Sequence, residues 1–239
     1  CAPPITDITA GILAAMGVLG AYVERLETGK GQKIDTSLFE AGITQTFWQA
    51  AMTLATGVSP GPLGSAHPMS APYQAFETSD GWITVGGSNQ VNWLRLVEIV
   101  GLPELAKDPR FLQNADRIQN VEVLASILGD RFKTRPREEW LELLEHGGVP
   151  AGPVASIGEM LTLPQTLARD MVVEVQHSQL GPVRTLGFPV KFSDTPASID
   201  RGAPLLGEHT PEGLTELDYT DEEIAELIRG GVARASMPT

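Results

Sequence analysis

A mostly apolar run from Ile8 to Val23 constrains the fold of this chain more than any other feature. Its apolar residues recur at helical spacing, and Thr6 and Asp7, two residue types that commonly cap helices, stand just ahead of it. The run stops at Glu24, is shorter than the roughly 20 residues of a membrane span, and has no basic flank of the kind that precedes a signal peptide. We therefore expect a helix that packs within a protein and no membrane partner.

Three glycines, Gly11, Gly17 and Gly20, interrupt this predicted helix. A glycine in a helix costs up to about 1 kcal/mol relative to alanine, so its presence needs a reason. Close packing against a neighbouring helix or sheet is the simplest one. The stretch from Thr28 to Gly31 is predicted to end the helix.

The rest of the chain mixes helical and strand patterns, which predicts an α/β fold with a small α+β domain inside a larger one. We expect Asn89 to cap a helix, and the stretch 148–154 to break the helical pattern. The remaining expected elements are a strand at 32–38, a helix from about 39 to 54, an irregular loop at 57–72, a β-hairpin at 73–78 and 82–86, helices at 120–132, 137–145, 157–161 and 221–228, and paired strands around Gly181-Pro182.

The composition limits the binding partners that the chain can have and the cellular compartment that suits it. The net charge of -13 argues against nucleic acid or an anionic membrane surface as the main partner, since both need a basic footprint. The single cysteine, Cys1, excludes a disulfide framework and a cysteine metal cluster, and we predict no metal site. We expect a reducing compartment, the cytoplasm, with the mitochondrial matrix as the alternative. Because the chain begins with Cys1 in a proline-rich stretch, we also expect it to be part of a longer protein.

Several short motifs follow one another in a characteristic order. Asp7 with Gly11 comes first, followed by a segment from Arg25 to Leu38 that contains Thr-Gly-Lys-Gly-Gln. The later motifs are His67-Pro68 with Ala71-Pro72-Tyr73 and Phe76, Asp80-Gly81, Gly148 to Val154, and Ala203 to Thr210. Together they cover nearly the whole chain. The ordered set resembles the C-terminal portion of the family III CoA-transferases, a family that includes formyl-CoA and carnitine CoA-transferases and 2-methylacyl-CoA racemases.

This resemblance implies an architecture. Residues 1–56 would be the end of a large, Rossmann-like domain with linker helices, residues 57–190 a small α+β domain, and residues 191–239 a tail that returns to the large domain. The family forms homodimers of two interlocked rings, so a homodimer is expected here.

The resemblance also implies a reaction, in which Asp7 is the nucleophile that attacks an acyl-CoA. The products would be an aspartyl anhydride and then an aspartyl-CoA thioester, from which CoA passes to a second carboxylic acid. Coenzyme A would be a substrate, with no tightly bound cofactor. Arg25, Lys30 and Lys33 lie near one turn and could contact the CoA phosphates or form a solvated basic turn. Without the resemblance, Asp7 would be interpreted as a helix cap.

A covering loop is implied at Gly64 to Pro68, with Gly64 or Ser65 nearest the acyl intermediate and Tyr73 and Asn89 supporting the loop. His67, in the same loop, could donate to the intermediate or anchor the loop. Small residues let backbone N–H groups approach a developing oxyanion. The alternative is a plain proline-rich connector. This loop lacks the consecutive glycines of some family members.

Two other functions stay open. A racemase of the same fold would carry a glutamate after the second hairpin strand, where this chain has Gly87-Ser88-Asn89-Gln90, and the nearest acid downstream is Glu98. An amide cannot act as a general base, which favours transfer. The third alternative is a non-catalytic structural portion, and we expect the isolated chain to be inactive. The sequence does not identify the acyl donor or acceptor.

Overall fold

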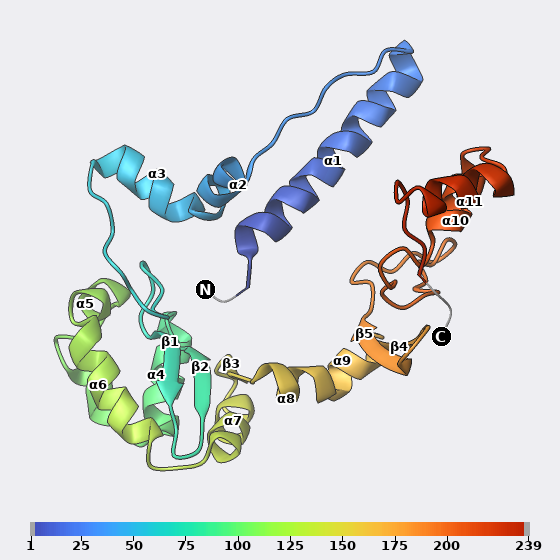
Figure 1. Cartoon of the computed structure of the whole chain (residues 1–239). Helices are drawn as coiled ribbons and strands as arrows, with labels where there is room; N and C mark the ends of the chain where they lie inside the picture. Colours follow the sequence, from blue (N-terminus) through green and yellow to red (C-terminus); the bar gives the residue numbers. More distant parts are fainter. Residues whose placement is uncertain (1–2, 237–239) are drawn as a thin grey trace. The chain divides into compact units, whose positions relative to one another are not determined.

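The computed structural model describes residues 3–236, so Cys1 lies outside the described residues. The chain divides into two compact units, Cys1–Pro68 and Met69–Thr239 (Figure 1). The first unit is helical where it is described, and the second combines helices with two small sheets. The predicted mixture of α and β structure is therefore confirmed.

The first unit contains α1 (Ile5–Thr28), α2 (Leu38–Gln45) and α3 (Phe47–Thr56). The predicted capping of α1 by Thr6 or Asp7 is wrong, because Pro4 precedes the first helical residue and Asp7 lies inside the first turn. The predicted end is confirmed: Gly29 adopts a left-handed φ of 74° and donates its N–H to the Arg25 carbonyl.

The length of α1 corrects one sequence inference. The helix has 24 residues, and its most apolar window has a mean hydropathy of 1.5 with 6% of the residues buried. By length and composition alone it could cross a membrane, so the prediction that this segment is too short for a span is wrong. The core helix of a soluble protein and a signal sequence pass the same test, so the finding is weak evidence for a membrane span.

The predicted strand at 32–38 is also wrong, because this segment is extended but joins no sheet in the described chain. It runs back alongside α1 (Figure 1). There the Cγ2 atom of Ile34 lies only 3.0 Å from the point where a Cβ on Gly17 would stand. Close packing thus explains Gly17, whereas a Cβ on Gly11 or Gly20 would meet no described atom within 4 Å.

The helix predicted at 39–54 is divided into α2 and α3. The break lies at Thr46, and the next residue, Phe47, begins α3 with a φ of 22° that is unfavourable for a bulky residue. The long loop predicted after α3 is confirmed, since residues 57–72 contain no helix or strand.

The second unit is built around a three-stranded antiparallel sheet of β1 (Tyr73–Glu77), β2 (Trp82–Gly86) and β3 (Ala151–Pro153), in the order β1-β2-β3. The predicted hairpin is β1 and β2, and it is confirmed. The strand β3 was not predicted; it occupies the stretch where the sequence indicated only a break. Its Gly152 pairs with Thr84.

Helices cover one face of this sheet and enclose the main core. Phe76, Ile83 and Val85 point into this core, while Thr84 and Trp82, which alternate with them, are exposed on the opposite face. Phe132 joins the core aromatics, with its ring 5.0 Å from Phe76 and 5.2 Å from Trp140. The surrounding helices are α4 (Gln90–Ile99), the 3-10 helix η1 (Pro103–Lys107), α5 (Asn114–Gln119), α6 (Val121–Phe132) and α7 (Arg137–His146).

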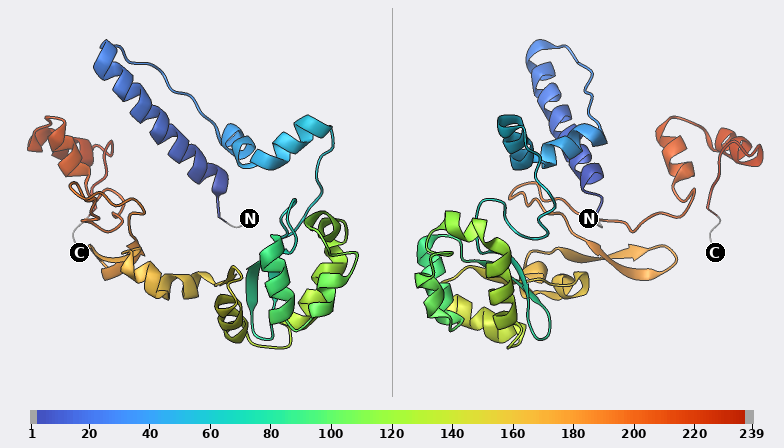
Figure 2. Two further views of the ribbon diagram at one scale, coloured as in Figure 1. Left: turned by 180° about the vertical axis from the view of Figure 1, so that it is seen from behind. Right: turned by 90° about the vertical axis from the view of Figure 1, so that its left-hand side faces the viewer.

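The remaining elements are short. The predicted strand pair is β4 (Val172–His177) and β5 (Gly181–Leu186), visible as a narrow ribbon in Figure 2. It turns at residues 178–180, so Gly181 and Pro182 belong to β5 and not to the turn. The helices are α8 (Ile157–Thr162), α9 (Pro164–Ala168), α10 (Thr210–Glu216) and α11 (Asp221–Arg229).

Candidate functional site

Asp7 is the third residue of α1, and its carboxylate is exposed. The Thr6 hydroxyl donates a hydrogen bond to Asp7 Oδ2 at 3.1 Å. The side chain is therefore accessible in the part of the structure described, and it stands at the end of α1 where backbone N–H groups leave a partial positive charge.

The second helix holds the residues on either side of Asp7. Gln45 Nε2 donates to Thr9 Oγ1 at 3.0 Å, and the Thr6 methyl lies 3.3 Å from where a Cβ on Gly42 would stand. A side chain at position 42 would push against the first turn of α1. Gly42 therefore allows the close approach that fixes the surroundings of Asp7.

The loop predicted to cover the intermediate is anchored at one end. Gly64 has a left-handed φ of 60°, and Gly64 and Ser65 are exposed. The His67 ring packs edge-on against Trp48 of α3, with 5.1 Å between ring centroids. These contacts tie Asp7 to Thr6 and His67 to Trp48, and none of them joins Asp7 to the loop. The contact with Trp48 supports the anchoring role expected for His67.

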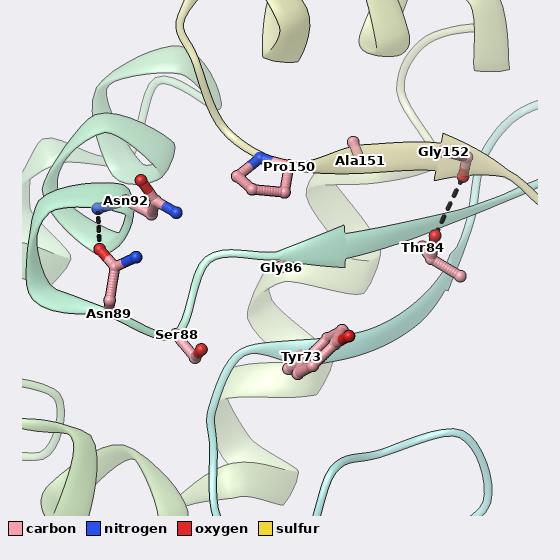
Figure 3. A pocket seen from close by; sticks show the side chains of 9 residues that line it. All are labelled: Tyr73, Thr84, Gly86, Ser88, Asn89, Asn92, Pro150, Ala151 and Gly152. Atoms are coloured by element: carbon pink, nitrogen blue, oxygen red, sulfur yellow. Dashed lines mark hydrogen bonds between the residues drawn. The ribbon is translucent and has the colours of Figure 1, made fainter.

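Tyr73 and Asn89 line one cavity of about 450 Å³ in the second unit (Figure 3). The strand register places Tyr73, Thr84, Gly86 and Gly152 on the sheet face opposite the core. The full lining consists of Tyr73, Thr84, Gly86, Ser88, Asn89, Asn92, Pro150, Ala151 and Gly152. The structure thus places Tyr73 and Asn89, which were predicted to have a supporting role, around one cavity.

Local hydrogen bonds fix the walls of this cavity. The Asn89 side chain caps α4 as predicted, accepting from the Asn92 backbone N–H at 2.8 Å. On the opposite wall, the Thr84 hydroxyl donates to the Gly152 carbonyl at 3.2 Å. Both interactions are drawn as dashed lines in Figure 3.

Arg117 is the residue that sequence reasoning missed. Its fully buried guanidinium donates to the carbonyls of Ala71 at 2.6 Å, Ser88 at 2.8 Å and Phe111 at 3.2 Å, and to Gln90 Oε1 at 3.2 Å. Burial lowers the pKa of this guanidinium, an effect that the nearby Asp116 carboxylate opposes. A single arginine in a six-residue helix gives no periodic signal, so the pattern could not identify it.

A second polar cluster surrounds the motif at 203–210. Here a cavity of about 200 Å³ is lined by residues that include His177, Ser178, Glu208 and His209. The backbone N–H of Leu205 donates to Glu208 at 2.6 Å, and this bond, with the Ser178 side chain and the two histidines, lowers the pKa of Glu208. Among the described residues, no group of three or more His, Cys, Asp or Glu side chains could hold a metal ion.

These features belong to a known class of protein. The family model described as CoA-transferase family III matches residues 1–210, a range that includes Asp7, the loop and the cavity residues. The chain belongs to CoA-transferase family III, as the ordered motifs predicted.

Individual relatives agree with this assignment. The chain is 34% identical over 229 residues to the succinyl-CoA:glutarate CoA-transferase of Homo sapiens, covering 95% of this chain and 52% of that protein. It is 36% identical over 207 residues to the acetyl-CoA:oxalate CoA-transferase of Acetobacter aceti, covering 85% and 51%. A crystal structure of a CAIB/BAIF family protein from Brucella suis superimposes with a TM-score of 0.79 at 36% identity, covering 91% of this chain and 56% of that one. The chain therefore spans about half the length of these relatives.

Proposed function

We propose that the protein containing this chain transfers CoA between an acyl-CoA and a carboxylic acid, with Asp7 as the nucleophile. The observation that carries the proposal is the exposed Asp7 carboxylate in the first turn of α1, within a segment that matches the family. Coenzyme A is a substrate here and not a resident cofactor.

The reaction balances without a redox step. An Asp7 oxygen attacks the thioester carbonyl, the C–S bond breaks, and CoA leaves as the thiolate from a mixed anhydride. The thiolate then attacks the Asp7 carbonyl carbon and releases the first acid, which leaves an aspartyl-CoA thioester. The acceptor carboxylate attacks this thioester, and the thiolate released attacks the acceptor carbonyl, which regenerates Asp7. Both intermediates hydrolyse in water, so the site must close around them.

Relatives indicate the class of acid. Their names specify succinyl-CoA with glutarate, mesaconate or D-citramalate, and acetyl-CoA with oxalate. Apart from the acetyl donor, these acids are short and carry a carboxyl group at each end. We propose the same class for this protein, acting as a homodimer in the cytoplasm, with Gly64 and Ser65 near the acyl intermediate.

Racemisation is the second candidate, and the cavity disfavours it. A racemase needs a base beside the α carbon, yet the lining residues at Ser88, Asn89 and Asn92 carry no carboxylate. Asn89 is instead engaged as the cap of α4. A non-catalytic structural portion remains the third candidate.

The test is replacement of Asp7 in the full-length protein. Asp7→Ala and Asp7→Asn should lower CoA transfer at least about a thousandfold, because an amide oxygen does not form the anhydride. Asp35→Asn, on an exposed carboxylate paired with Lys33 at 3.4 Å, is the matched control and should retain turnover. Hydroxylamine added with acyl-CoA should convert Asp7 to a hydroxamate detectable by peptide mass spectrometry. Wild-type turnover in Asp7→Ala would refute the assignment and redirect it to Asp35 or Asp80.

A further inference from the structure

The cavity on the uncovered face of the sheet is lined by polar but uncharged side chains. Tyr73, Thr84 and Ser88 contribute hydroxyls, and Asn89 and Asn92 contribute carboxamides. The described residues that line it include no Lys, Arg, Asp or Glu, and no large aliphatic side chain. A pocket of this kind recognises oxygen or nitrogen atoms by hydrogen bonds and gains little from an alkyl chain.

The two carboxamides lie next to each other at the start of α4 (Figure 3). Because Asn89 Oδ1 accepts from the Asn92 backbone N–H at 2.8 Å, the Asn89 amide nitrogen is left as a donor toward the cavity. No hydrogen bond engages the Asn92 carboxamide in the described part of the chain. The positive end of the α4 dipole lies at the same edge and adds to the attraction for an anion.

The backbone that carries the Asn89 donor is held in place before any ligand arrives. Arg117 holds the Ser88 carbonyl at 2.8 Å and Gln90 Oε1 at 3.2 Å, which fixes the segment that joins β2 to α4. On the other wall, the Thr84 hydroxyl holds Gly152 of β3. Preorganised donors lose little conformational entropy when a ligand binds, so a small ligand can be held by few contacts.

We propose that this cavity binds one carboxylate end of a short dicarboxylic acid, with Asn89 and Asn92 donating to its oxygen atoms. The proposal rests on the proposed CoA-transferase function, whose acid substrate would be the ligand. Hydrogen bonds from neutral amides to a carboxylate are charge-assisted and strong. An alkyl end of the same length would leave both carboxamides without partners, so the cavity should select against it.

Asn92→Asp is the sharpest test, because it should affect stability and binding in opposite directions. Asn92 is the third residue of α4 after the Asn89 cap, a position where an acid favours the helix. The melting temperature should therefore stay constant or rise. Succinate, used as the probe, should bind at least about tenfold more weakly and show a KM raised by the same factor, because two carboxylates repel. Gln179→Glu adds the same charge on an exposed turn outside the cavity and serves as the control.

Asn92→Leu completes the test by removing the amide while nearly preserving the size of the side chain. It should weaken succinate binding several-fold and reduce the preference for succinate over butyrate, an acid of equal chain length. Unchanged succinate affinity in Asn92→Asp, or equal binding of succinate and butyrate by the wild type, would overturn the proposal. If the wild type binds succinate through Asn92 but transfers no CoA with any donor, the site is upheld and the proposed function fails.

Discussion

At the scale of single residues, Arg117 shows how one buried side chain can organise a site from a distance. Its guanidinium donates to the carbonyls of Ala71, Ser88 and Phe111, which belong to segments remote in sequence. It also lies 5.0 Å over the Trp93 ring. Three carbonyl acceptors require a donor with several N–H groups in one plane, which only arginine supplies.

Replacing Arg117 should therefore destabilise the protein strongly. Arg117→Met leaves three carbonyls with no donor, and we expect a loss of about 3 kcal/mol in the free energy of unfolding. Arg117→Lys should recover only part of the loss, because one ammonium group cannot reach all three acceptors. Urea denaturation monitored by circular dichroism measures the free energy of unfolding of each variant.

Arg110→Met is the control for this experiment. Arg110 is half exposed and pairs with Asp108 at 2.7 Å, so its loss should change the stability by less than about 1 kcal/mol. Equal effects of the two replacements would show that Arg117 is not the organising residue.

The sequence could predict residues whose role is local, and it failed for those whose role depends on distant partners. Asn89 was recognisable as a cap because its side-chain oxygen and the N–H that donates to it are three positions apart. The role of Asp7 as nucleophile stays a prediction from the resemblance. Its predicted role as a helix cap was wrong, because Asp7 lies inside the first turn of α1. Arg117 was missed because its acceptors lie up to 46 positions away.

At the scale of elements, the first turn of α7 links two other pieces of the second unit. The Arg137 backbone N–H donates to Asp80 Oδ1 at 2.7 Å in the hairpin turn. Its guanidinium donates to Glu159 Oε1 at 2.9 Å, and Glu159 also belongs to the capping box of α8. This arrangement connects β1 and β2 to the start of α8.

The link should be visible as a pH dependence. The Arg137 guanidinium, followed by the Ser156 N–H and hydroxyl, lowers the pKa of Glu159 from 4.5 to about 2. Because the folded-state pKa is depressed, the stabilisation is present above pH 4.5 and is lost as the pH falls through about 2. NMR titration of the Glu159 carboxyl should show this value, and Arg137→Met should raise it toward 4.5. As a control, Arg184→Met on β5 should leave the pKa of Glu159 unchanged.

The loop at Gly64 gives a second prediction at this scale. Gly64→Trp should lower turnover of the full-length protein about tenfold or more by obstructing the acyl group. Because the φ of 60° disfavours any side chain, the substitution also strains the backbone by roughly 1–2 kcal/mol.

Gly64→Ala separates the two effects of that substitution, since it introduces the strain without the bulk and should keep most of the turnover. Steady-state rates with several acyl donors provide the measurement. If Gly64→Trp and His67→Ala both turn over like the wild type, the loop is only a connector.

Strands, too, were predicted correctly where the interactions that define them are close in sequence. The hairpin β1–β2 was predictable because its turn residues, Ser79-Asp80-Gly81, stand between two alternating runs. The strand β3 has only three residues, and its partner β2 lies 68 positions earlier at the Thr84–Gly152 bond. Conversely, residues 32–38 have a strand pattern, but no described strand pairs with them.

At the scale of the whole molecule, the apolar surface of α1 remains to be covered. Ile12, Met16 and Leu19 are each more than half exposed, and Ala10 is the one buried residue among those described in this helix. A contiguous apolar face of this kind usually marks an interface. The boundaries expected at residues 56 and 190 and the interlocked arrangement stay predictions.

We predict that the full-length protein is a homodimer. Light scattering coupled to size exclusion should give twice the mass of one chain at micromolar concentration, because the exposed face of α1 must be buried in the assembled protein. Met16→Glu should lower the dimer fraction, whereas Glu24→Gln on the same helix should not. A monomer mass for the wild type would contradict the prediction.

Because β3 lies far from β2 in the sequence, it limits how the second unit can be truncated. A fragment that ends before Ala151 would contain the hairpin and its covering helices, yet β2 would become an edge strand with open N–H and C=O groups. Such a fragment would lose one wall of the cavity and gain a surface prone to pairing with other chains. A piece that retains both the sheet and the cavity must therefore include Tyr73 through Pro153.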